Sequence, residues 1–412
     1  MANALDYLFW RGDLSFEKDP FGDVDNLLCA LISYIDFEGQ IPQSTEQTVP
    51  LKSAVDAYFE KMRGRDLHLG AIIPPVIFEG AEKMAASARF SQICLTAYED
   101  VVKEVDDVQV QWKALTMLLG DGTMYISFSG TDDTLIGWKE DFDMAVCDTI
   151  PSQREAAEYV RRVMTAYPCY GVRLGGHSKG GNLAIYAAAK CGRDLQDRIV
   201  AVYGNDAPGF SKSFLSEDEY LAIKPRVRLI LPDQSFVGLL FYHDAPRTVV
   251  KSSERSVRQH DALSWQVAGN RFEEVPAVTG EALLLRKTVE AWMNDMSPEE
   301  RKAFVEAFYR ALTCLEAKTL TDLMEDRAIL LRSYRHLEPE QRQIIREMLR
   351  RLLSSGKDVY SAAISKGSRQ VQQEDRRKKQ AKKSAAKKGF VTHLDGASIG
   401  IPAAKKKKTP GK

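Results

Sequence analysis

The sequence feature that most constrains the fold is a glycine-rich turn at residues 175–181, Gly-Gly-His-Ser-Lys-Gly-Gly. A short segment predicted as a strand precedes it at 170–174, and an alanine-rich segment without helix breakers follows at 182–190. Gly-x-Ser-x-Gly between a strand and a helix is typical of a nucleophile elbow, a sharp turn that presents a serine hydroxyl. The pattern therefore predicts a reactive serine, Ser178, at the end of one strand of an α/β sheet.

The elbow glycines have a steric reason. Gly176 and Gly180 lie two residues before and after Ser178, where side chains would collide with so tight a turn. The helix that follows points its N-terminus at the serine, which favours developing negative charge there. A phosphate-binding loop is the competing interpretation, but the chain lacks Gly-Lys-Ser/Thr at the spacing that such a loop needs.

Strands and helices alternate along the centre of the chain. Strands are predicted at 108–118, 123–128, 170–174, 199–204 and 227–231, with helices at 154–167 and 182–190. This alternation predicts an α/β-hydrolase-like, mostly parallel sheet with helices on both faces. We expect a helical N-terminal segment that packs on the core (1–100), the α/β-hydrolase core (101–280), a helical C-terminal region (281–356) and a basic tail (357–412).

A formal net charge of zero conceals a strong asymmetry along the chain. From Lys366 onward there are 15 Lys and Arg against 3 Asp and Glu, a charge of +12, so the remainder, with 42 against 54, carries −12. The tail has few large apolar residues and is predicted to be disordered. Its clusters at 376–379 and 405–408 could bind an anionic partner weakly, a nucleic acid or a membrane surface, although a solubilising tail is the simpler interpretation.

Cysteine usage and hydropathy exclude several classes of protein. The six cysteines form no Cys-x-x-Cys pair, so neither a zinc site nor a disulfide framework is predicted, and reduced thiols fit a cytoplasmic location. The N-terminus lacks the basic and apolar regions of a signal peptide. No stretch approaches the roughly 20 apolar residues of a membrane-spanning helix.

A serine nucleophile needs a base, a carboxylate that orients the base, and an oxyanion hole, but no metal and no cofactor. Two histidines, His243 and His260, follow the last predicted strand, where the base is expected. We prefer His260, because His243 follows an apolar run and could be a packed core residue. The other four are excluded because of their position in the elbow, before the sheet, or in the C-terminal helices and tail: His177, His68, His336 and His393.

Two aspartates are candidates for the acid. Asp206 and Asp233 each follow directly on a predicted strand, where the acid of such enzymes lies. Either could instead cap a turn, since aspartate near glycine or proline often does so. Their spacing along the chain leaves the choice between them open.

Two segments resemble the oxyanion-hole region of class 3 (fungal-type) lipases. Residues 126–132, Ile-Ser-Phe-Ser-Gly-Thr-Asp, followed by 137–141, Gly-Trp-Lys-Glu-Asp, are similar to the Phe-x-Gly-Ser/Thr block and the downstream Trp and Asp of that family. In those enzymes the residue after the glycine supplies one oxyanion-hole donor. The resemblance implies that the backbone N–H groups of Thr131 and Lys179 are the two donors.

The resemblance continues in the same order along the chain. Residues 202–209 are similar to the family's Phe-Gly-x-Pro-x-x-Gly turn, and 226–233 resemble its strand that ends in the triad aspartate. His260 with Trp265 resembles its late His and Trp.

On these positions the resemblance implies a triad of Ser178, Asp233 and His260, with Asp206 and His243 as the alternative acid and base.

The whole chain resembles more closely a bacterial family of α/β-hydrolase-like proteins, a domain of unknown function whose activity is not established. Residues 5–13, Leu-Asp-Tyr-Leu-Phe-Trp-Arg-Gly-Asp, and the elbow sequence His-Ser-Lys-Gly-Gly-Asn at 177–182 carry this likeness, which extends from residue 1 to about residue 330. It implies the fold and says almost nothing about the substrate.

One departure from the lipases concerns Lys179, which stands where those enzymes usually have leucine. Such a lysine favours an anionic or polar acyl substrate, or simply reaches solvent from the first turn of a helix. No segment near residues 134–138 is long enough to indicate a lid. The sequence therefore predicts a serine hydrolase that cleaves a small carboxylic ester or thioester. The alternative is a catalytically weak binding or scaffold protein that uses the helical extension and the basic tail.

Overall fold

The computed structural model describes residues 1–67, 69, 73–105, 108–132, 135–144, 146–313, 319 and 327–361. The chain divides into two compact units, Met1–Gly356 and Lys357–Lys412. In the second unit residues 357–361 are helical, and the rest of the predicted basic tail, with its lysine clusters, lies outside the described residues.

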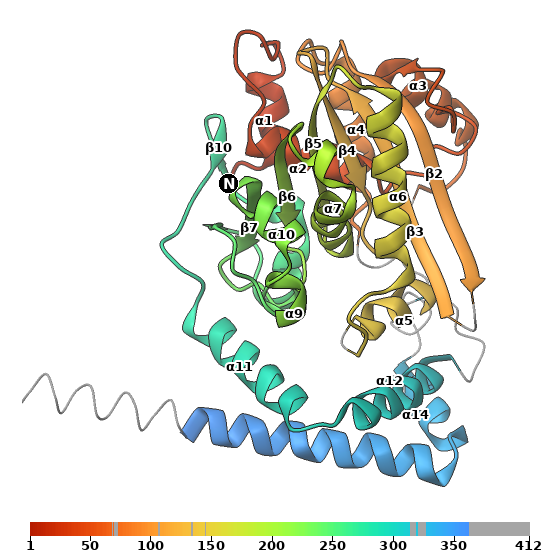
Figure 1. The fold of residues 1–412 in the computed structure, drawn as a ribbon, viewed down its shortest axis with the longest axis vertical. Helices are drawn as coiled ribbons and strands as arrows, with labels where there is room; N and C mark the ends of the chain where they lie inside the picture. The colour runs from red at the N-terminus through yellow and green to blue at the C-terminus, as the bar shows by residue number, and fades with distance from the viewer. Residues whose placement is uncertain are drawn as a thin grey trace, which may run out of the picture. The chain divides into compact units, whose positions relative to one another are not determined.

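The first unit is built on an eight-stranded sheet in which the strands follow one another in sequence order (Figure 1). The strands are β1 (Val49–Pro50), β2 (Cys94–Val105), β3 (Val108–Leu118), β4 (Thr123–Phe128), β5 (Gly171–His177), β6 (Ile199–Asn205), β7 (Val227–Pro232) and β8 (Arg247–Val250). The pairs from β1 to β4 are antiparallel and those from β4 to β8 are parallel. The predicted α/β-hydrolase-like, mostly parallel sheet is confirmed.

Helices surround this sheet. Those of the first unit are α1 (Ala4–Arg11), α2 (Asp23–Ile32), α3 (Leu51–Lys61), α4 (Val76–Ala86), α5 (Leu135–Asp143), α6 (Pro151–Ala166), α7 (Lys179–Lys190), α8 (Arg193–Gln196), α9 (Lys212–Leu215), α10 (Asp218–Ile223), α11 (Gly280–Asn294), α12 (Pro298–Thr313), α14 (Arg327–His336) and residues 339–356. A small two-stranded sheet joins β9 (Val267–Ala268) to β10 (Arg271–Phe272). Within the described residues no helix is long and apolar enough to cross a membrane.

The strand order decides which helices cover which face. Crossovers between parallel strands are right-handed, and a sequential order without reversal therefore places α6, α7 and α10 on the same face. Along β4, Met124 and Ile126 point into the core beneath these helices. Tyr125 points into a second core on the opposite face, which α1, α2, α3 and α4 cover. The helices of the N-terminal segment thus cover the face of the sheet that the crossover helices α6, α7 and α10 leave open.

Most predicted strands and helices of the core are present, and β3 and β4 have the predicted bounds. Five strands were not predicted: β1, β2 and β8 of the main sheet, and β9 and β10. In β2 a bulge between Thr96 and Glu99 interrupts the pairing with β3, and Ala97 has a φ of 53°, so the alternation that marks a strand is broken. The last predicted strand, at 227–231, is followed in the sheet by β8, which has only four residues.

A buried ion pair fastens the N-terminal layer. The guanidinium of Arg89 contacts both oxygens of the Asp25 carboxylate, at 2.6 Å each, and neither side chain is exposed. Arg89 also donates to the carbonyl oxygens of Leu14, Asp19 and Pro20. A buried charge pair is tolerated only when its remaining donors find partners, as they do here.

Arg89→Met should lower the free energy of unfolding by about 3–5 kcal/mol, because it leaves the buried Asp25 carboxylate without a positive charge, with only the Tyr7 hydroxyl and the Gly22 N–H to donate to it. Urea denaturation measures this loss. Lys52→Ala is the matched control, since it breaks an exposed pair with Asp56 and should change stability by less than about 1 kcal/mol. A loss in Arg89→Met no larger than that of the control would contradict the assigned role.

Candidate active site

Ser178 lies between β5 and α7 on a strained backbone. Its φ is 58° and its ψ is −133°, a conformation that residues with a Cβ rarely adopt. The Ser178 N–H donates to the Asn205 carbonyl oxygen of β6 at 2.9 Å, and the Ser178 carbonyl accepts from Gly181 N–H at 3.0 Å. These bonds hold the turn to the sheet in an elbow.

The two glycines that flank Ser178, Gly176 and Gly180, lie in close contact with neighbouring backbone atoms. A Cβ at Gly176 would stand 2.3 Å from the Gly180 carbonyl carbon, and one at Gly180 would stand 2.1 Å from the Phe128 carbonyl oxygen. Neither position has room for a side chain, because β4, β5 and α7 approach one another at backbone distance here. The elbow can form only with glycine at both places.

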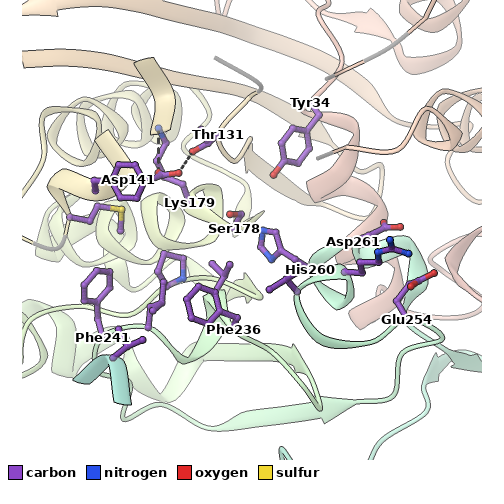
Figure 2. A pocket seen from close by; sticks show the side chains of 18 of the residues that line it. Tyr34, Thr131, Asp141, Ser178, Lys179, Phe236, Phe241, Glu254, His260 and Asp261 are labelled. Carbon is purple, nitrogen blue, oxygen red and sulfur yellow. Dashed lines mark hydrogen bonds and ion pairs between the residues drawn. The ribbon is translucent and has the colours of Figure 1, made fainter. Parts of the chain in front are cut away.

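A cavity of about 770 Å³ opens in front of Ser178 (Figure 2). The serine is half-buried and lines the cavity together with His260. Figure 2 shows the two side chains next to each other on the cavity wall. The predicted nucleophile and the predicted base therefore share one site.

The carboxylate beside His260 belongs to Asp206. Its Oδ2 lies 2.7 Å from Nδ1 of the imidazole, and its Oδ1 accepts from the hydroxyl of Ser235 and from Gly238 N–H. A carboxylate only accepts, so Nδ1 carries a proton, and in the neutral imidazole Nε2 then has the lone pair. Burial raises the pKa of Asp206. The hydrogen bond from His260 and the positive charge of its protonated form lower it by more, so the pKa lies below its ordinary value.

Asp233, which the resemblance to lipases favoured as the acid, has a different neighbour. Its Oδ1 accepts from Nε2 of Gln259 at 2.8 Å. Gln259 is the residue before His260, so Asp233 steadies the loop of the base without touching the imidazole. Of the two candidate aspartates, Asp206 is the one whose carboxylate contacts the imidazole.

His243, the alternative base, is not among the residues that line the cavity. Burial, and then the charge of Arg247, lowers the pKa of His243 to about 4, so it stays neutral. The residue as a whole is half-buried. His68 and His393 lie outside the described residues.

Thr131 lies at the edge of the cavity, where the oxyanion-hole region was predicted. Its hydroxyl donates to Oδ2 of Asp141 on α5 at 2.6 Å. Burial raises the pKa of Asp141 to about 6, against the opposing charge of Lys179. The side chain of Thr131 is thus engaged by α5.

Lys179 does not reach solvent, and that expectation was wrong. Its side chain is 1% exposed, and Nζ donates to Glu140 Oε2 at 3.0 Å and to the Gln111 carbonyl at 2.9 Å. Burial lowers the pKa of Lys179, but the carboxylates of Glu140 and Asp141 raise it by more. Because the charge of Lys179 is neutralised by these carboxylates, it would attract an anionic substrate only weakly. The Lys179 N–H, at the first residue of α7, has no acceptor within the helix.

Sequence reasoning excluded His177 as the base, and its side chain indeed turns away from the serine. Its Nε2 lies 2.8 Å from the His260 carbonyl oxygen and its Nδ1 lies 3.0 Å from the Tyr34 hydroxyl. Burial, and then the proximity of His260, lowers the pKa of His177 to about 3. The contacts of His177, and the presence of Tyr34 at the cavity wall, had no signal in the sequence.

The cavity has a mainly apolar wall. Aromatic and aliphatic side chains from three parts of the chain form it, among them Phe142, Phe236, Leu240, Phe241, Val289 and Met293. Val289 and Met293 belong to α11, so the helical C-terminal region contributes to the wall. In the described part of the chain no group of three or more His, Cys, Asp or Glu side chains could hold a metal ion.

Comparison with known proteins gives a family and distant structural likenesses. The family model described as Mbeg1-like matches residues 84–310, more than half of the chain, within the region that the sequence resemblance covered. No curated protein matches.

Among solved structures, a Rhizomucor miehei lipase in a propeptide complex is 15% identical over 42% of this chain and 70% of its own, with a TM-score of 0.27. The M37 lipase is 11% identical over 63% of this chain and 84% of its own, with a TM-score of 0.30. At TM-scores this low, neither likeness supports an argument about the chemistry of this chain.

Asp141→Asn should change how stability depends on pH. Because the pKa of Asp141 is raised from 3.8 to about 6, the folded state binds this proton more tightly than the unfolded state. Its stabilising contribution is complete below about pH 4 and is lost as the pH rises to about 6. Urea denaturation from pH 4 to pH 8 should show the variant gaining on the wild type up to about pH 6. Asp56→Asn, at an exposed carboxylate, is the control, and a constant offset for Asp141→Asn would contradict the assignment.

Proposed function

The chain belongs to the Mbeg1-like family, and we propose that it is a serine hydrolase that cleaves a carboxylic ester or thioester through an acyl-enzyme on Ser178. The observation that carries this proposal is the contact of His260 with Asp206 beside a serine on a strained elbow. A merely structural turn has no need of a left-handed serine whose hydroxyl faces a cavity. Along the chain the three residues are Ser178, Asp206 and His260, which is the order of nucleophile, acid and base in α/β-hydrolases.

The first half-reaction follows from these positions. The Ser178 hydroxyl attacks the acyl carbon while Nε2 of His260 takes its proton, and Asp206 stabilises the imidazolium that forms. His260 then returns the proton to the leaving alcohol or thiol. In the second half-reaction the same nitrogen deprotonates a water molecule, which attacks the acyl-enzyme and frees Ser178.

The negative charge of the tetrahedral intermediate needs donors that are already in place. The N–H of Lys179, free at the start of α7, and the N–H of Thr131 supply them, aided by the positive end of the helix. Losing one such donor typically costs ~10²–10³ in rate.

The cavity favours an apolar acyl group. Its volume of about 770 Å³ and its wall of aromatic and aliphatic side chains would bury a hydrocarbon chain, whereas the one cation at the elbow is already neutralised by Glu140. This revises the preference for a small ester that the sequence suggested. The substrate proposed is an ester or thioester with an extended apolar acyl chain.

A fluorophosphonate probe tests the nucleophile directly. Wild-type protein should be labelled at one serine and should hydrolyse p-nitrophenyl esters, with kcat/KM rising with acyl chain length. Ser178→Ala should lose both properties while it remains folded by circular dichroism. Ser213→Ala, at an exposed serine, is the control and should keep them. Folded wild-type protein that is neither labelled nor active would overturn the proposal, and a binding or scaffold role would then be the better account.

Asp206→Asn and Asp233→Asn distinguish the acid. Asp206→Asn should lower kcat by about 10⁴-fold, because the amide no longer holds Nδ1 as the protonated nitrogen. Asp233→Asn should lower it far less, since it disturbs only the bond to Gln259. Steady-state kinetics on the best p-nitrophenyl ester compares the two, and an equal or reversed order would return the role of acid to Asp233.

A further inference from the structure

We propose that three polar side chains of the elbow, those of His177, Lys179 and Asn182, are positioning residues that each fix a different part of the catalytic machinery. His177 fixes the loop of the base, Lys179 fixes the helix beside the oxyanion hole, and Asn182 fixes the turn of the acid. This inference rests on the proposed function, because it assigns roles around Ser178 as the nucleophile. All three side chains are buried.

The contact of His177 with the base loop has a defined direction. A carbonyl oxygen only accepts, so Nε2 of His177 carries the proton and donates to the His260 carbonyl at 2.8 Å. Nδ1 is then the acceptor and receives the Tyr34 hydroxyl at 3.0 Å. The two imidazole rings also lie 4.5 Å apart between centroids. Asp206 holds the ring of His260, and His177 holds its backbone.

The bonds of Lys179 reach the oxyanion hole through α5. Lys179 and Thr131, whose N–H groups are the proposed donors, are bound by consecutive residues of that helix, Glu140 and Asp141. Glu140 is fully buried and also accepts the N–H groups of Gln111 and Ser152. The Lys179–Glu140 ion pair and the Thr131–Asp141 hydrogen bond therefore join the two donor segments through α5.

The amide of Asn182 holds the turn that follows Asp206. Its Nδ2 donates to the carbonyl oxygens of Pro208 and Gly209, at 3.1 and 2.9 Å. Its Oδ1 accepts from Nε2 of Gln153 on α6 at 2.8 Å. Asp206 itself has a φ of 45°, so its direction depends on how this turn is anchored.

These contacts radiate from a segment of six residues, 177–182, that the Ser178 N–H bond fixes to β6. The nucleophile, base, acid and oxyanion donors come from different strands and loops, and a displacement of about 1 Å can cost ~10²-fold in rate. Hydrogen bonds from one rigid segment to each part reduce such displacement. The side chains next to the serine thus set the mutual geometry of the site.

The decisive experiment uses variants at the partners, which spare the elbow. These are Tyr34→Phe for the base, Glu140→Gln for the oxyanion hole and Gln153→Leu for the acid. Tyr159→Phe is the matched control, because it removes an equally buried hydroxyl, bonded to the Ala97 carbonyl at 2.7 Å, outside the cavity. For each variant kcat, KM, the pH profile of kcat/KM and the midpoint of urea unfolding are measured on the best p-nitrophenyl ester.

Each variant at a partner should lower kcat by about 10- to 100-fold with KM within about twofold, as expected for misplaced catalytic groups. Tyr34→Phe should also displace the acidic limb of the pH profile, and Glu140→Gln should weaken an alkyl boronic acid inhibitor in proportion to kcat. Lys179→Met combined with Glu140→Gln removes both buried charges and should regain unfolding midpoint relative to Lys179→Met, but not kcat. The control should lose stability only.

The outcomes separate the two proposals. If the wild type is active but the partner variants behave like Tyr159→Phe, with a lower unfolding midpoint and unchanged kcat and pH profile, the positioning roles are refuted and the hydrolase stands. Recovery of kcat in the double variant would refute the role of Lys179 in the same way. If the wild type shows neither turnover nor labelling, the hydrolase itself is refuted.

Discussion

The close approach of β4, β5 and α7 at the elbow is the constraint on which the site depends. At Gly176 and Gly180 backbone meets backbone, and a single methyl group at either place would push the strand and the helix apart. This contact forces Ser178 into a left-handed conformation of a kind that typically costs of order 1–3 kcal/mol and persists only where its surroundings over-determine it. Here the hydrogen bond to Asn205 and the packing of the glycines do so. The strain is the means by which the hydroxyl stands clear of the sheet.

Prediction from sequence succeeded where local pattern and tertiary structure agree. The alternation of β3 and β4, the elbow and the helices on either side of it follow from periodicity and turn chemistry within short windows. It failed at β2, where a bulge interrupts the period, and at β8, which is four residues long. Sequence reasoning also allowed Lys179 to reach solvent, because a short window of sequence cannot show that Glu140, on another helix, forms a buried ion pair with it.

The acid shows a second kind of limit. Asp206 and Asp233 each follow a parallel strand, and neighbouring parallel strands end at the same edge of the sheet, so both carboxylates arrive close to the loop of His260. The choice is made by the unusual backbone at Asp206 and by Gln259, which takes up Asp233. Neither feature can be predicted from the spacing of residues along the sequence. Resemblance favoured Asp233, because it compares the order of the strands and carries no information on which carboxylate contacts the imidazole.

The sequential order of the strands has a consequence for how the protein is made. One face of the sheet is covered by helices α1, α2, α3 and α4, which leave the ribosome before any of the parallel strands beneath them. Helix α2, which packs on β4 and β5, must therefore remain partly unburied during synthesis until these strands have emerged, a period in which its apolar face is open to wrong association. Tyr34, just after α2, contacts His177 at the end of β5, so the candidate site cannot be complete before β5 is in place.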